Sequence, residues 1–347
     1  MIDENRPKPE PGAARVGVVL VNWKRAADTI ECLESLLRST IPLQVVVVDN
    51  ASGDGSLETI AAWAAGTHGQ TAASPAMAAF SEPAFVKPLP VVQMAADAAA
   101  ATDPQGILTL IASDHNGGFA AGNNIGLRHL LRNPQLDYFW LLNNDTVVAA
   151  AAAAALLTRL DSTPRVGMCG TVVAYYWRPE TVQALGGHRF NLWTGTSHGI
   201  GAGLPLTQSF DPAKIARETD FVLGASLAVG RKFLEAIGPM EQRYFLYFEE
   251  IDWATRSGDR FKIAFANGAV VYHKEGGSIG SSARPGERSP TSDYWLARSR
   301  LMFIRLHHPL LLPWHWVLTI GTAVRRLLRG HPAKALIILR ALFGVKY

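Results

Sequence analysis

The sequence predicts an α/β protein: a mixed, mainly parallel sheet flanked by helices, followed by a helical tail at the C-terminal end. Two short, β-branched runs, residues 16–22 and 43–48, are typical of buried strands, and each ends in polar side chains. Between them, residues 29–38 carry apolar side chains at helical spacing, and Pro42 ends this helix. The order strand, helix, strand favours parallel pairing through crossover connections.

The same alternation continues after an alanine- and proline-rich insertion over residues 66–105. We expect this insertion to be a mobile loop, with a functional lid as the alternative. The expected strands cover residues 107–111, 138–142, 166–173, 221–230, 261–265 and 269–272. Helices are expected at residues 57 onward, 125–131, 149–160 and 232–237, and an irregular or antiparallel stretch is expected between residues 175 and 214.

Composition sets the broad class of protein. The chain has 347 residues, of which 48% are hydrophobic, so it is long enough to bury a large core. Cys32 and Cys169 lack CxxC spacing and lie in apolar runs, which predicts buried free thiols and a reducing, cytoplasmic compartment. The net charge of +4 is too small to indicate nucleic-acid binding. Residues 1–14 are polar and are expected to form a disordered leader rather than a secretory signal.

The stretch Tyr138-Phe-Trp-Leu-Leu-Asn-Asn-Asp-Thr146 is an apolar strand that ends in two amides, a carboxylate and a hydroxyl. The carboxyl ends of parallel strands open into the crevice where such sheets bind ligands, so Asp145 is a candidate ligand of a metal or phosphate group. Asn143, Asn144 and Asp145 are also common turn and cap residues, and a helix is predicted after them. Taken alone, the stretch supports both interpretations.

Two later segments add further chemistry. Residues 244–253 form an aromatic run that ends in three acids, and a helix starting at Glu249 would place Glu249 and Asp252 one turn apart. Glu250 would lie on a neighbouring face of that helix. The strand at residues 269–272 delivers His273, and residues 276–278 are expected to form a flexible loop.

These pieces together resemble family 2 glycosyltransferases, and most closely their bacterial rhamnosyltransferase-like branch. The resemblance runs from about Val16 to Leu306 and rests on motifs in the family's order, each at a predicted strand end. The motifs are Val-Asn22-Trp, Val-Val-Asp49-Asn-Ala-Ser-Gly-Asp54-Gly-Ser, Asn116-Gly-Gly-Phe-Ala-Ala-Gly-Asn-Asn124, Leu-Leu-Asn143-Asn-Asp145, Gly224-Ala-Ser, Phe-Glu249-Glu-Ile-Asp252-Trp and Val-Val-Tyr-His273. The resemblance implies the GT-A fold, with a catalytic domain over residues 15–300 and a tail over residues 301–347.

The resemblance also implies a divalent cation, Mn²⁺ or Mg²⁺, bound by Asp145 and His273. Such a cation neutralises the charge that builds on a leaving diphosphate. Asp145 ends the family's Asp-x-Asp motif, which here reads Asn143-Asn144-Asp145 and keeps only one carboxylate. The ordinary alternative for His273 is a histidine satisfied by hydrogen bonds at a strand end.

A base must also take the proton from the acceptor hydroxyl. The family assigns this role to the second acid of a Glu-Asp pair, which matches Glu250, with Glu249 as its rival. Gly224, Ala225, Asp252 and Trp253 are expected on the acceptor side. For Asp252, helix capping or pairing with Arg243 or Arg256 is the alternative.

The nucleotide is expected at the ends of the first two strands. Asp49 resembles the family's base-contacting aspartate, and the glycines of the loop after residue 113 are expected to let the backbone approach the diphosphate and donor sugar. The predicted nucleotide and donor residues are Asn22, Asp49, Asp54, Asn116, Gly117, Gly118, Gly122, Asn124 and Asn144. For Asp54, a structural role in a turn is the favoured interpretation.

The tail is basic and apolar, because no acidic residue follows Asp293. Residues 306–324 contain prolines and histidines, which argues against a membrane-spanning helix. Trp314 and Trp316 suit the headgroup level of a bilayer, and the basic residues would meet anionic lipid; packing on the catalytic domain is the alternative for part of the tail. These basic residues are Arg325, Arg326, Arg329, Lys334 and Arg340.

The sequence therefore predicts an inverting, metal-dependent glycosyltransferase, peripheral on the inner face of the bacterial cytoplasmic membrane. Its donor would be dTDP-rhamnose or a UDP-sugar, and its acceptor a lipid-linked glycan in surface polysaccharide synthesis. A sugar-phosphate nucleotidyltransferase is one alternative, although it needs a glycine-rich signature with a basic residue where Asn22 and Trp23 stand. A non-catalytic nucleotide-binding homologue is the other, since the Asn143-Asn144-Asp145 motif has a single carboxylate.

Overall fold

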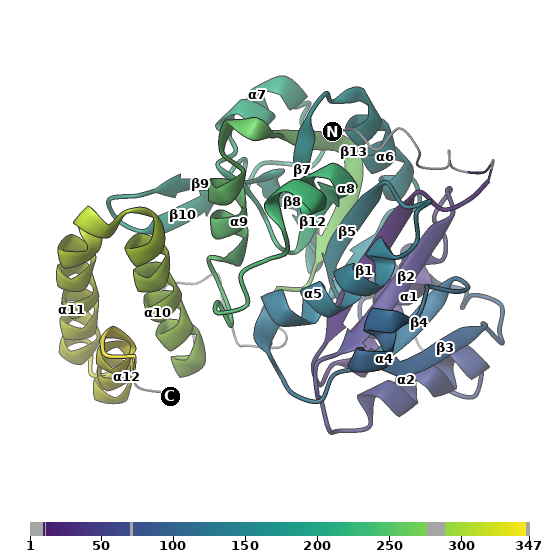
Figure 1. The fold of residues 1–347 in the computed structure, drawn as a ribbon, viewed down its shortest axis with the longest axis horizontal. Coiled ribbons are helices and arrows are strands. Elements are labelled where there is room, and N and C mark those ends of the chain that lie inside the picture. The colour runs from purple at the N-terminus through teal and green to yellow at the C-terminus, as the bar shows by residue number, and fades with distance from the viewer. Residues whose placement is uncertain (1–9, 11, 70–71, 276–288, 345–347) are drawn as a thin grey trace.

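The computed structural model describes residue 10 and residues 12–69, 72–275 and 289–344 (Figure 1). Most of the predicted leader and the loop predicted at residues 276–278 therefore lie outside the described residues. The strands are β1 Val16–Asn22, β2 Leu43–Asp49, β3 Val91–Ala95, β4 Leu108–Ala112, β5 Tyr138–Asn143, β6 Thr146–Val148, β7 Val166–Tyr175, β8 Arg178–Leu185, β9 Gly187–Asn191, β10 Thr196–Gly199, β11 Phe221–Val222, β12 Ser226–Gly230 and β13 Lys262–His273. The helices are α1 Ala26–Leu36, α2 Ser56–Ala65, α3 Ala78–Ser81, α4 Ala96–Ala101, α5 Gly118–Leu131, α6 Ala152–Ser162, α7 Pro212–Glu218, α8 Arg231–Ile237, α9 Glu249–Ser257, α10 Pro290–His307, α11 Leu312–Leu328 and α12 Pro332–Leu342.

The central sheet has the order β3-β4-β2-β1-β5-β12-β7-β13-β6, with β8 paired to β7. The first five strands of this order are parallel to one another, and β13 is parallel to β7. Strand β12 runs antiparallel between β5 and β7, and β6 runs antiparallel to β13. The predicted mixed, mainly parallel α/β fold is confirmed.

Helices cover both faces of this sheet, as a doubly wound arrangement requires. On one face, α1, α2 and α6 contribute Ile30, Trp63 and Leu156 to a core that extends beneath β1, β2 and β13. On the other face, α5 and α8 contribute Leu127 and Phe233 to a second core. The strands between them are almost entirely apolar because both of their faces are buried.

Two strand predictions were wrong in their boundaries. Residues 221–230 were expected to form one strand, but β11 pairs with β9 in a small antiparallel sheet and β12 joins the central sheet. Residues 223–225 lie between the two strands and form the turn that carries Gly224. Conversely, the two strands expected within residues 261–272 are one strand, β13, which is interrupted by an irregularity between Ala266 and Val270.

The insertion at residues 66–105 is not a mobile loop in the described part of the chain. Its strand β3 extends the sheet by pairing in parallel with β4, and α4 follows directly. Buried carboxylates on α1 hold the preceding segment: Glu34 accepts hydrogen bonds from Phe85 N at 2.6 Å and Lys87 Nζ at 2.5 Å. The alanine- and proline-rich composition did not predict this ordered structure, because the contacts that hold the segment come from residues far away in the sequence.

The predicted domain boundary at residues 300 and 301 falls inside α10, which is one continuous helix. Helices α10, α11 and α12 form a unit beside the catalytic body, and the β9–β10 hairpin extends toward them (Figure 1). His315 Nε2 donates to Leu192 O at 2.9 Å and Trp314 Nε1 donates to Trp193 O at 2.8 Å, so the tail packs on this hairpin. Among the described residues, no helix is both long and apolar enough to cross a membrane.

Cys32 and Cys169 are buried free thiols, as predicted. Burial raises the pKa of each thiol to about 12, so neither is a reactive thiolate at neutral pH.

Candidate active site

The site forms where strand ends from distant parts of the chain meet at one edge of the sheet. Asn22 at the end of β1 pairs in register with Asp49 at the end of β2, and Val21 pairs with Asn143 at the end of β5. Because these strands are parallel, their carboxyl ends open at the same edge. The antiparallel strand β12 starts at this edge, and Asn143 N donates to Ala225 O at 3.0 Å.

Asp145 and His273 face one another, although 128 residues of sequence numbering separate them in the chain. Strand β13 places His273 opposite Thr146 in the β6 pairing, which brings its Nε2 to 3.3 Å from Asp145 Oδ1. The two side chains are 9% and 7% exposed, so this contact is shielded from bulk water. The structure thus brings the predicted metal pair together.

Each member of this pair stabilises the charged form of the other. Burial alone would lower the pKa of His273, but the Asp145 carboxylate outweighs it, and the net shift is upward. Burial alone would raise the pKa of Asp145, but the facing imidazole lowers it below its usual range. The spot between them therefore attracts a positive charge, whether a proton or a cation.

The donor set fits a divalent cation. A carboxylate oxygen and an imidazole nitrogen converge, and Gln183 Oε1 occupies the other ring nitrogen, His273 Nδ1, at 2.9 Å. Oxygen with one nitrogen suits Mn²⁺ or Mg²⁺. No group of three or more His, Cys, Asp or Glu side chains gathers in the described ranges, so diphosphate oxygens and water would have to complete the coordination shell.

The predicted acids lie at the start of α9. Phe248 and Tyr247, immediately before the helix, both have left-handed backbone conformations, with φ of 73° and 66°. This sharp turn orients Glu249 and Glu250 differently, and such strain in non-glycine residues is typical of functional sites. Helix α10 supports the turn, because Trp295 stacks on Phe245 with ring centroids 4.6 Å apart.

Glu250 is the partly exposed acid, and it lies directly against Gly224. A Cβ on Gly224 would come 2.0 Å from Glu250 Oε1, so a larger residue at position 224 would displace the carboxylate from where it lies. Burial raises the pKa of Glu250 to about 7. Gly224 adjoins Ala225, whose carbonyl accepts from Asn143, so Glu250 is linked by direct contacts to the turn that carries Asp145.

Glu249 is only 2% exposed, and its Oε2 has no hydrogen-bond partner among the described residues. Burial, reinforced by the neighbouring Glu250 charge, raises the pKa of Glu249 well above its usual range. The environment of Glu249 therefore favours its neutral form. Of the two acids, Glu250 is the one placed to exchange a proton with a ligand.

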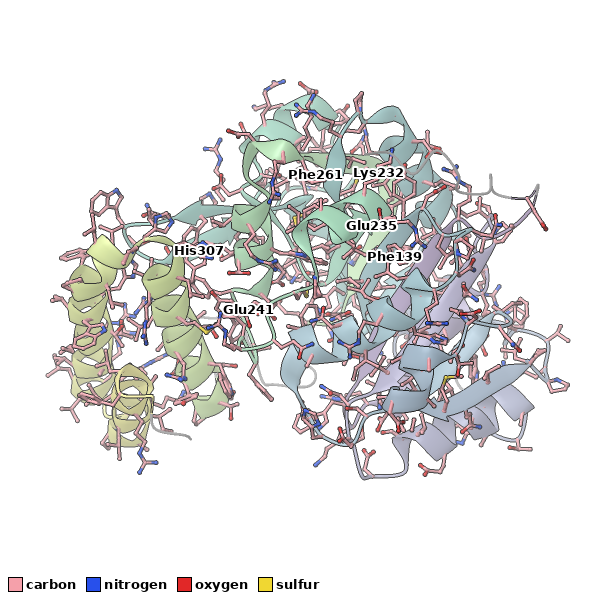
Figure 2. All side chains as sticks on the ribbon, viewed as in Figure 1. Phe139, Lys232, Glu235, Glu241, Phe261 and His307 are labelled. Carbon is pink, nitrogen blue, oxygen red and sulfur yellow. The ribbon has the colours of Figure 1, made fainter. Side chains whose placement is uncertain are left out.

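Two residues expected on the acceptor side have structural roles instead. Trp253 is fully buried against Phe233, and its Nε1 donates to Gly238 O at 2.9 Å. Asp252 is 1% exposed and accepts from Arg256 Nε and His307 Nε2, each at 2.7 Å. Figure 2 shows His307 where α10 approaches α9. Asp252 thus fastens the tail to the helix that carries the acids.

The ends of β1 and β2 form a buried polar network. Asp49 accepts from Asn22 Nδ2 at 2.7 Å and from Ser52 Oγ at 2.5 Å. Asn22 Oδ1 accepts from Thr29 Oγ1 at 2.8 Å, and the same Thr29 oxygen accepts from Asn144 Nδ2 at 2.9 Å. Asn144 therefore shapes the turn and joins it to β1, while Asn22 and Asp49 keep the position predicted for them.

Other predicted nucleotide residues stabilise the chain locally. Asn124 is fully buried, and its amide exchanges hydrogen bonds with Met240 N and O at 3.1 and 2.8 Å. Asp54 is exposed and accepts from Ser56 N at 3.1 Å and Ser56 Oγ at 2.6 Å, at the start of α2. We assign Asn124 to the core and Asp54 to a turn, because their polar atoms are used by these neighbours.

Gly117, Gly118 and Gly122 were expected to leave space for a ligand, but other protein atoms lie in that space. Gly118 has φ of +84°, and a Cβ there would meet Phe245 O at 2.1 Å. A Cβ on Gly122 would meet Val21 Cγ1 at 2.7 Å, and one on Gly117 would meet Ala121 at 2.6 Å. Asn116 Oδ1 accepts from Asn50 Nδ2 at 2.9 Å, which ties this loop to the end of β2.

Sequence reasoning did not single out Gln183, Lys274 or the α1 carboxylates. Lys274 Nζ lies 2.5 Å from Asp28 and 2.6 Å from Glu31, and its backbone N donates to Asp145 O at 3.0 Å. This buried cluster holds the end of β13 against the Asp145 turn. The position of Lys274 directly after His273 was the one sequence feature that could have indicated its place beside the site. Nothing in the spacing of Asp28, Glu31 or Gln183 pointed to the site.

Comparison with known proteins supports the fold. No protein-family profile matches the chain, and no curated protein sequence is similar to it. The mannosyltransferase PcManGT from Pyrobaculum calidifontis, solved with GDP-Man and Mn²⁺, has a TM-score of 0.50 and 16% identity over 97% of this chain and 88% of that one. GalNAc-T7, solved with UDP, GalNAc and Mn²⁺, has a TM-score of 0.51 and 14% identity over 86% of this chain.

This chain spans 55% of the length of GalNAc-T7. At these identities the likeness concerns the fold. The large, mainly parallel sheet flanked by helices is therefore the GT-A fold of these glycosyltransferases.

Proposed function

We propose that the protein is an inverting glycosyltransferase that moves a sugar from a nucleotide diphosphate to a hydroxyl group of a glycan. The observation that carries this proposal is the meeting of the Asp145–His273 pair and Glu250 at one edge of a GT-A sheet. The Asp145–His273 pair would hold a cation against the diphosphate, and Glu250 would accept the proton of the attacking hydroxyl.

The proposed reaction is a single displacement. The acceptor oxygen forms a bond to the anomeric carbon while the bond from that carbon to the diphosphate oxygen breaks, which inverts the configuration. Glu250 takes the proton of the acceptor hydroxyl, and the nucleoside diphosphate leaves. A divalent cation held by Asp145 and His273 would supply the positive charge that stabilises the leaving diphosphate.

The nucleotide is placed over the ends of β1 and β2, beside Asn22 and Asp49. The loop at Asn116 would approach the diphosphate and donor sugar. The two solved relatives in fold were crystallised with GDP-Man and with UDP, each with Mn²⁺, which supports a nucleotide-sugar donor and a divalent cation. We propose dTDP-rhamnose or a UDP-sugar as donor, on the resemblance of the motifs.

We also propose that the tail binds the cytoplasmic face of the bacterial membrane and that the acceptor is a lipid-linked glycan of surface polysaccharide synthesis. Val317, Ile320, Val324 and Leu328 form an apolar stripe along α11, and each is between 45% and 82% exposed. Exposed basic residues flank the stripe, and anionic headgroups would complement them. We name this stripe with its flanking basic residues Arg325 and Arg329 the α11 face.

Ligand-dependent stabilisation tests the enzymatic proposal. Thermal unfolding is measured with dTDP-, UDP- and GDP-sugars, each with and without Mn²⁺, and release of nucleoside diphosphate is assayed in parallel. A donor present at 100 times its Kd should stabilise the protein by about 2.7 kcal/mol. Asp145→Ala should abolish the Mn²⁺-dependent part of this stabilisation and the release of diphosphate.

The same experiment distinguishes the proposed enzyme from a non-catalytic nucleotide-binding homologue. The single carboxylate of the Asn143-Asn144-Asp145 motif favours this alternative. Such a protein would be stabilised by a donor but would release no nucleoside diphosphate under any condition. Absence of both stabilisation and release with every donor would refute the proposed function.

A further inference from the structure

We propose that Gln183 is the positioning residue for His273: it fixes the imidazole so that Nε2 faces Asp145 and a divalent cation. This inference rests on the proposed function, because it assumes that Asp145 and His273 bind the metal. Gln183 Oε1 lies 2.9 Å from His273 Nδ1. No sequence motif includes Gln183, and it comes from β8, 90 residues before the histidine that it contacts.

The chemistry of the Gln183 amide and the His273 imidazole determines which ring nitrogen carries a proton. A neutral imidazole has one N–H donor and one lone-pair nitrogen, and an amide oxygen can only accept. The contact with Gln183 Oε1 therefore keeps an N–H on Nδ1 whether the imidazole is charged or neutral, so Nε2 is the nitrogen left for a cation, which would replace the proton shared with Asp145. That nitrogen is the one 3.3 Å from Asp145 Oδ1, so the two metal-binding atoms point at the same spot.

The amide orientation is consistent with a second neighbour. The Glu275 side chain interacts with Gln183 as well, and a carboxylate can accept only from the amide nitrogen. A Gln183 nitrogen on the side of Glu275 agrees with the contact of Gln183 Oε1 with His273 Nδ1.

The fold places Gln183 by a break in strand pairing. Along β8, Ala184 pairs with Val173 and Val182 pairs with Ala174, so Gln183 is an extra residue with no partner of its own on β7. Such a bulge re-aims a side chain and is common beside active sites. On the other side of β7, His273 pairs with Tyr175, so the re-aimed amide reaches across β7 to the imidazole.

Partners that orient a metal-binding histidine typically change metal affinity by about 10- to 100-fold when they are lost. We therefore expect Gln183→Leu, which keeps the bulk and removes the acceptor, to weaken Mn²⁺ binding about 10-fold. Gln183→Glu keeps an acceptor oxygen and should bind Mn²⁺ at least as well as the unmodified protein.

The experiment measures Mn²⁺ affinity from the electron paramagnetic resonance signal of free Mn²⁺, with UDP and with GDP in separate series. Gln44→Leu is the matched control, because it makes the same substitution at a buried glutamine on β2 whose partners, Gly106 and Asn133, lie outside the site. Nitrogen-15 NMR of His273 in the metal-free protein, at a pH high enough to leave the imidazole neutral, reports which ring nitrogen carries the proton, a property that a purely structural role would not alter.

Weakened Mn²⁺ binding and loss of the Nδ1–H form in Gln183→Leu, but not in Gln183→Glu or Gln44→Leu, would support the inference. Unchanged Mn²⁺ affinity in Gln183→Leu would overturn it, provided that Asp145→Ala and His273→Ala both weaken binding. If those two variants bind Mn²⁺ normally, the proposed metal site fails as well, so the two failures are distinguishable.

Discussion

Glu250 is the residue on which the proposed reaction depends most directly. Burial raises the pKa of Glu250 to about 7, and its carboxylate lies where Gly224 leaves room for it. Glu249, one residue earlier, is buried, one of its oxygens has no hydrogen-bond partner among the described residues, and burial raises its pKa well above its usual range. Because neighbouring carboxyl groups differ this much in environment, only one of them is suited to act as a base near pH 7.

A base acts only when ionised, so the rate should rise as the pH passes upward through about 7, the pKa of Glu250. Glu250→Gln should lower kcat by about 10²- to 10⁴-fold and remove this rising limb. The measurement is the pH profile of nucleoside diphosphate release. Glu249→Gln is the matched control and should keep the limb; a limb that survives in Glu250→Gln but disappears in Glu249→Gln would reverse the assignment.

The same pKa shift has a consequence for stability with a definite sign. The folded-state pKa of Glu250 lies above its ordinary value, so ionising this carboxyl group costs stability as the pH rises through that interval. Glu250→Gln should therefore unfold at a higher temperature than the unmodified protein at pH 8, and this gain should vanish at pH 4. Such a trade between stability and activity is common at active sites.

At the scale of elements, α1 organises the surroundings of the site through two buried glutamates. Glu31 accepts from Tyr176 Oη at 2.6 Å and pairs with Lys274 beside Asp145 and His273. Glu34, almost one turn later, accepts from Trp63 Nε1 at 2.8 Å and from Lys87 Nζ at 2.5 Å. One face of a single helix thus holds both the end of β13 and the segment at residues 66–105.

Removing the Glu34 charge should release that segment. Glu34→Gln keeps the side-chain shape but leaves Lys87, 11% exposed, without its counter-charge, which should destabilise the protein by about 3 kcal/mol. Hydrogen exchange of residues 72–105 should accelerate more than that of β1 and β5. The double variant Glu34→Gln with Lys87→Met should recover part of the stability; equal exchange in all three proteins would contradict the prediction.

At the scale of the whole molecule, the tail packs on the catalytic body through specific contacts. His307 contacts Asp252 on α9, and Ser299 Oγ donates to Leu246 O at 2.8 Å, so α10 is held to the catalytic body. Within the tail, Arg326 on α11 pairs with the buried Asp293 on α10 at 2.8 Å. Trp314 adds the contact with the β9–β10 hairpin, whose Trp193 is 65% exposed. These contacts fix the α11 face relative to the site, so a membrane bound there would hold the site at a defined orientation.

Vesicle binding tests the α11 face. Ile320→Asp should lower binding to vesicles that contain anionic lipid by about 10-fold, because it replaces an apolar contact with a charge of the lipid's own sign. The control Ile107→Asp changes an isoleucine of similar exposure, 48% against 45%, at the start of β4. Sedimentation with the vesicles measures binding, and raised salt should weaken it by screening the basic residues. Equal binding of both variants would rule out this face.

The resemblance of the motifs implied the pairing of Asp145 with His273. The sequence by itself determined the mainly parallel α/β fold, most strands of the central sheet and the polar motifs at their ends. These features are local or repeat a pattern: apolar runs form buried strands, and polar residues at their ends collect at one edge of a parallel sheet. The resemblance also placed Glu250 ahead of Glu249, and the structure shows a difference between them: Glu249 is buried and Glu250 is partly exposed.

Only the tertiary structure decided which polar side chains remain available to a ligand. Asn124, Asp252 and Trp253 sit within the motifs, yet each is occupied by a neighbour that the sequence does not reveal. Gln183 lies outside every motif, yet it reaches His273 through a bulge in β8. The physical reason is that a hydrogen bond forms over about 3 Å, so the register of strands distant in sequence determines which groups meet.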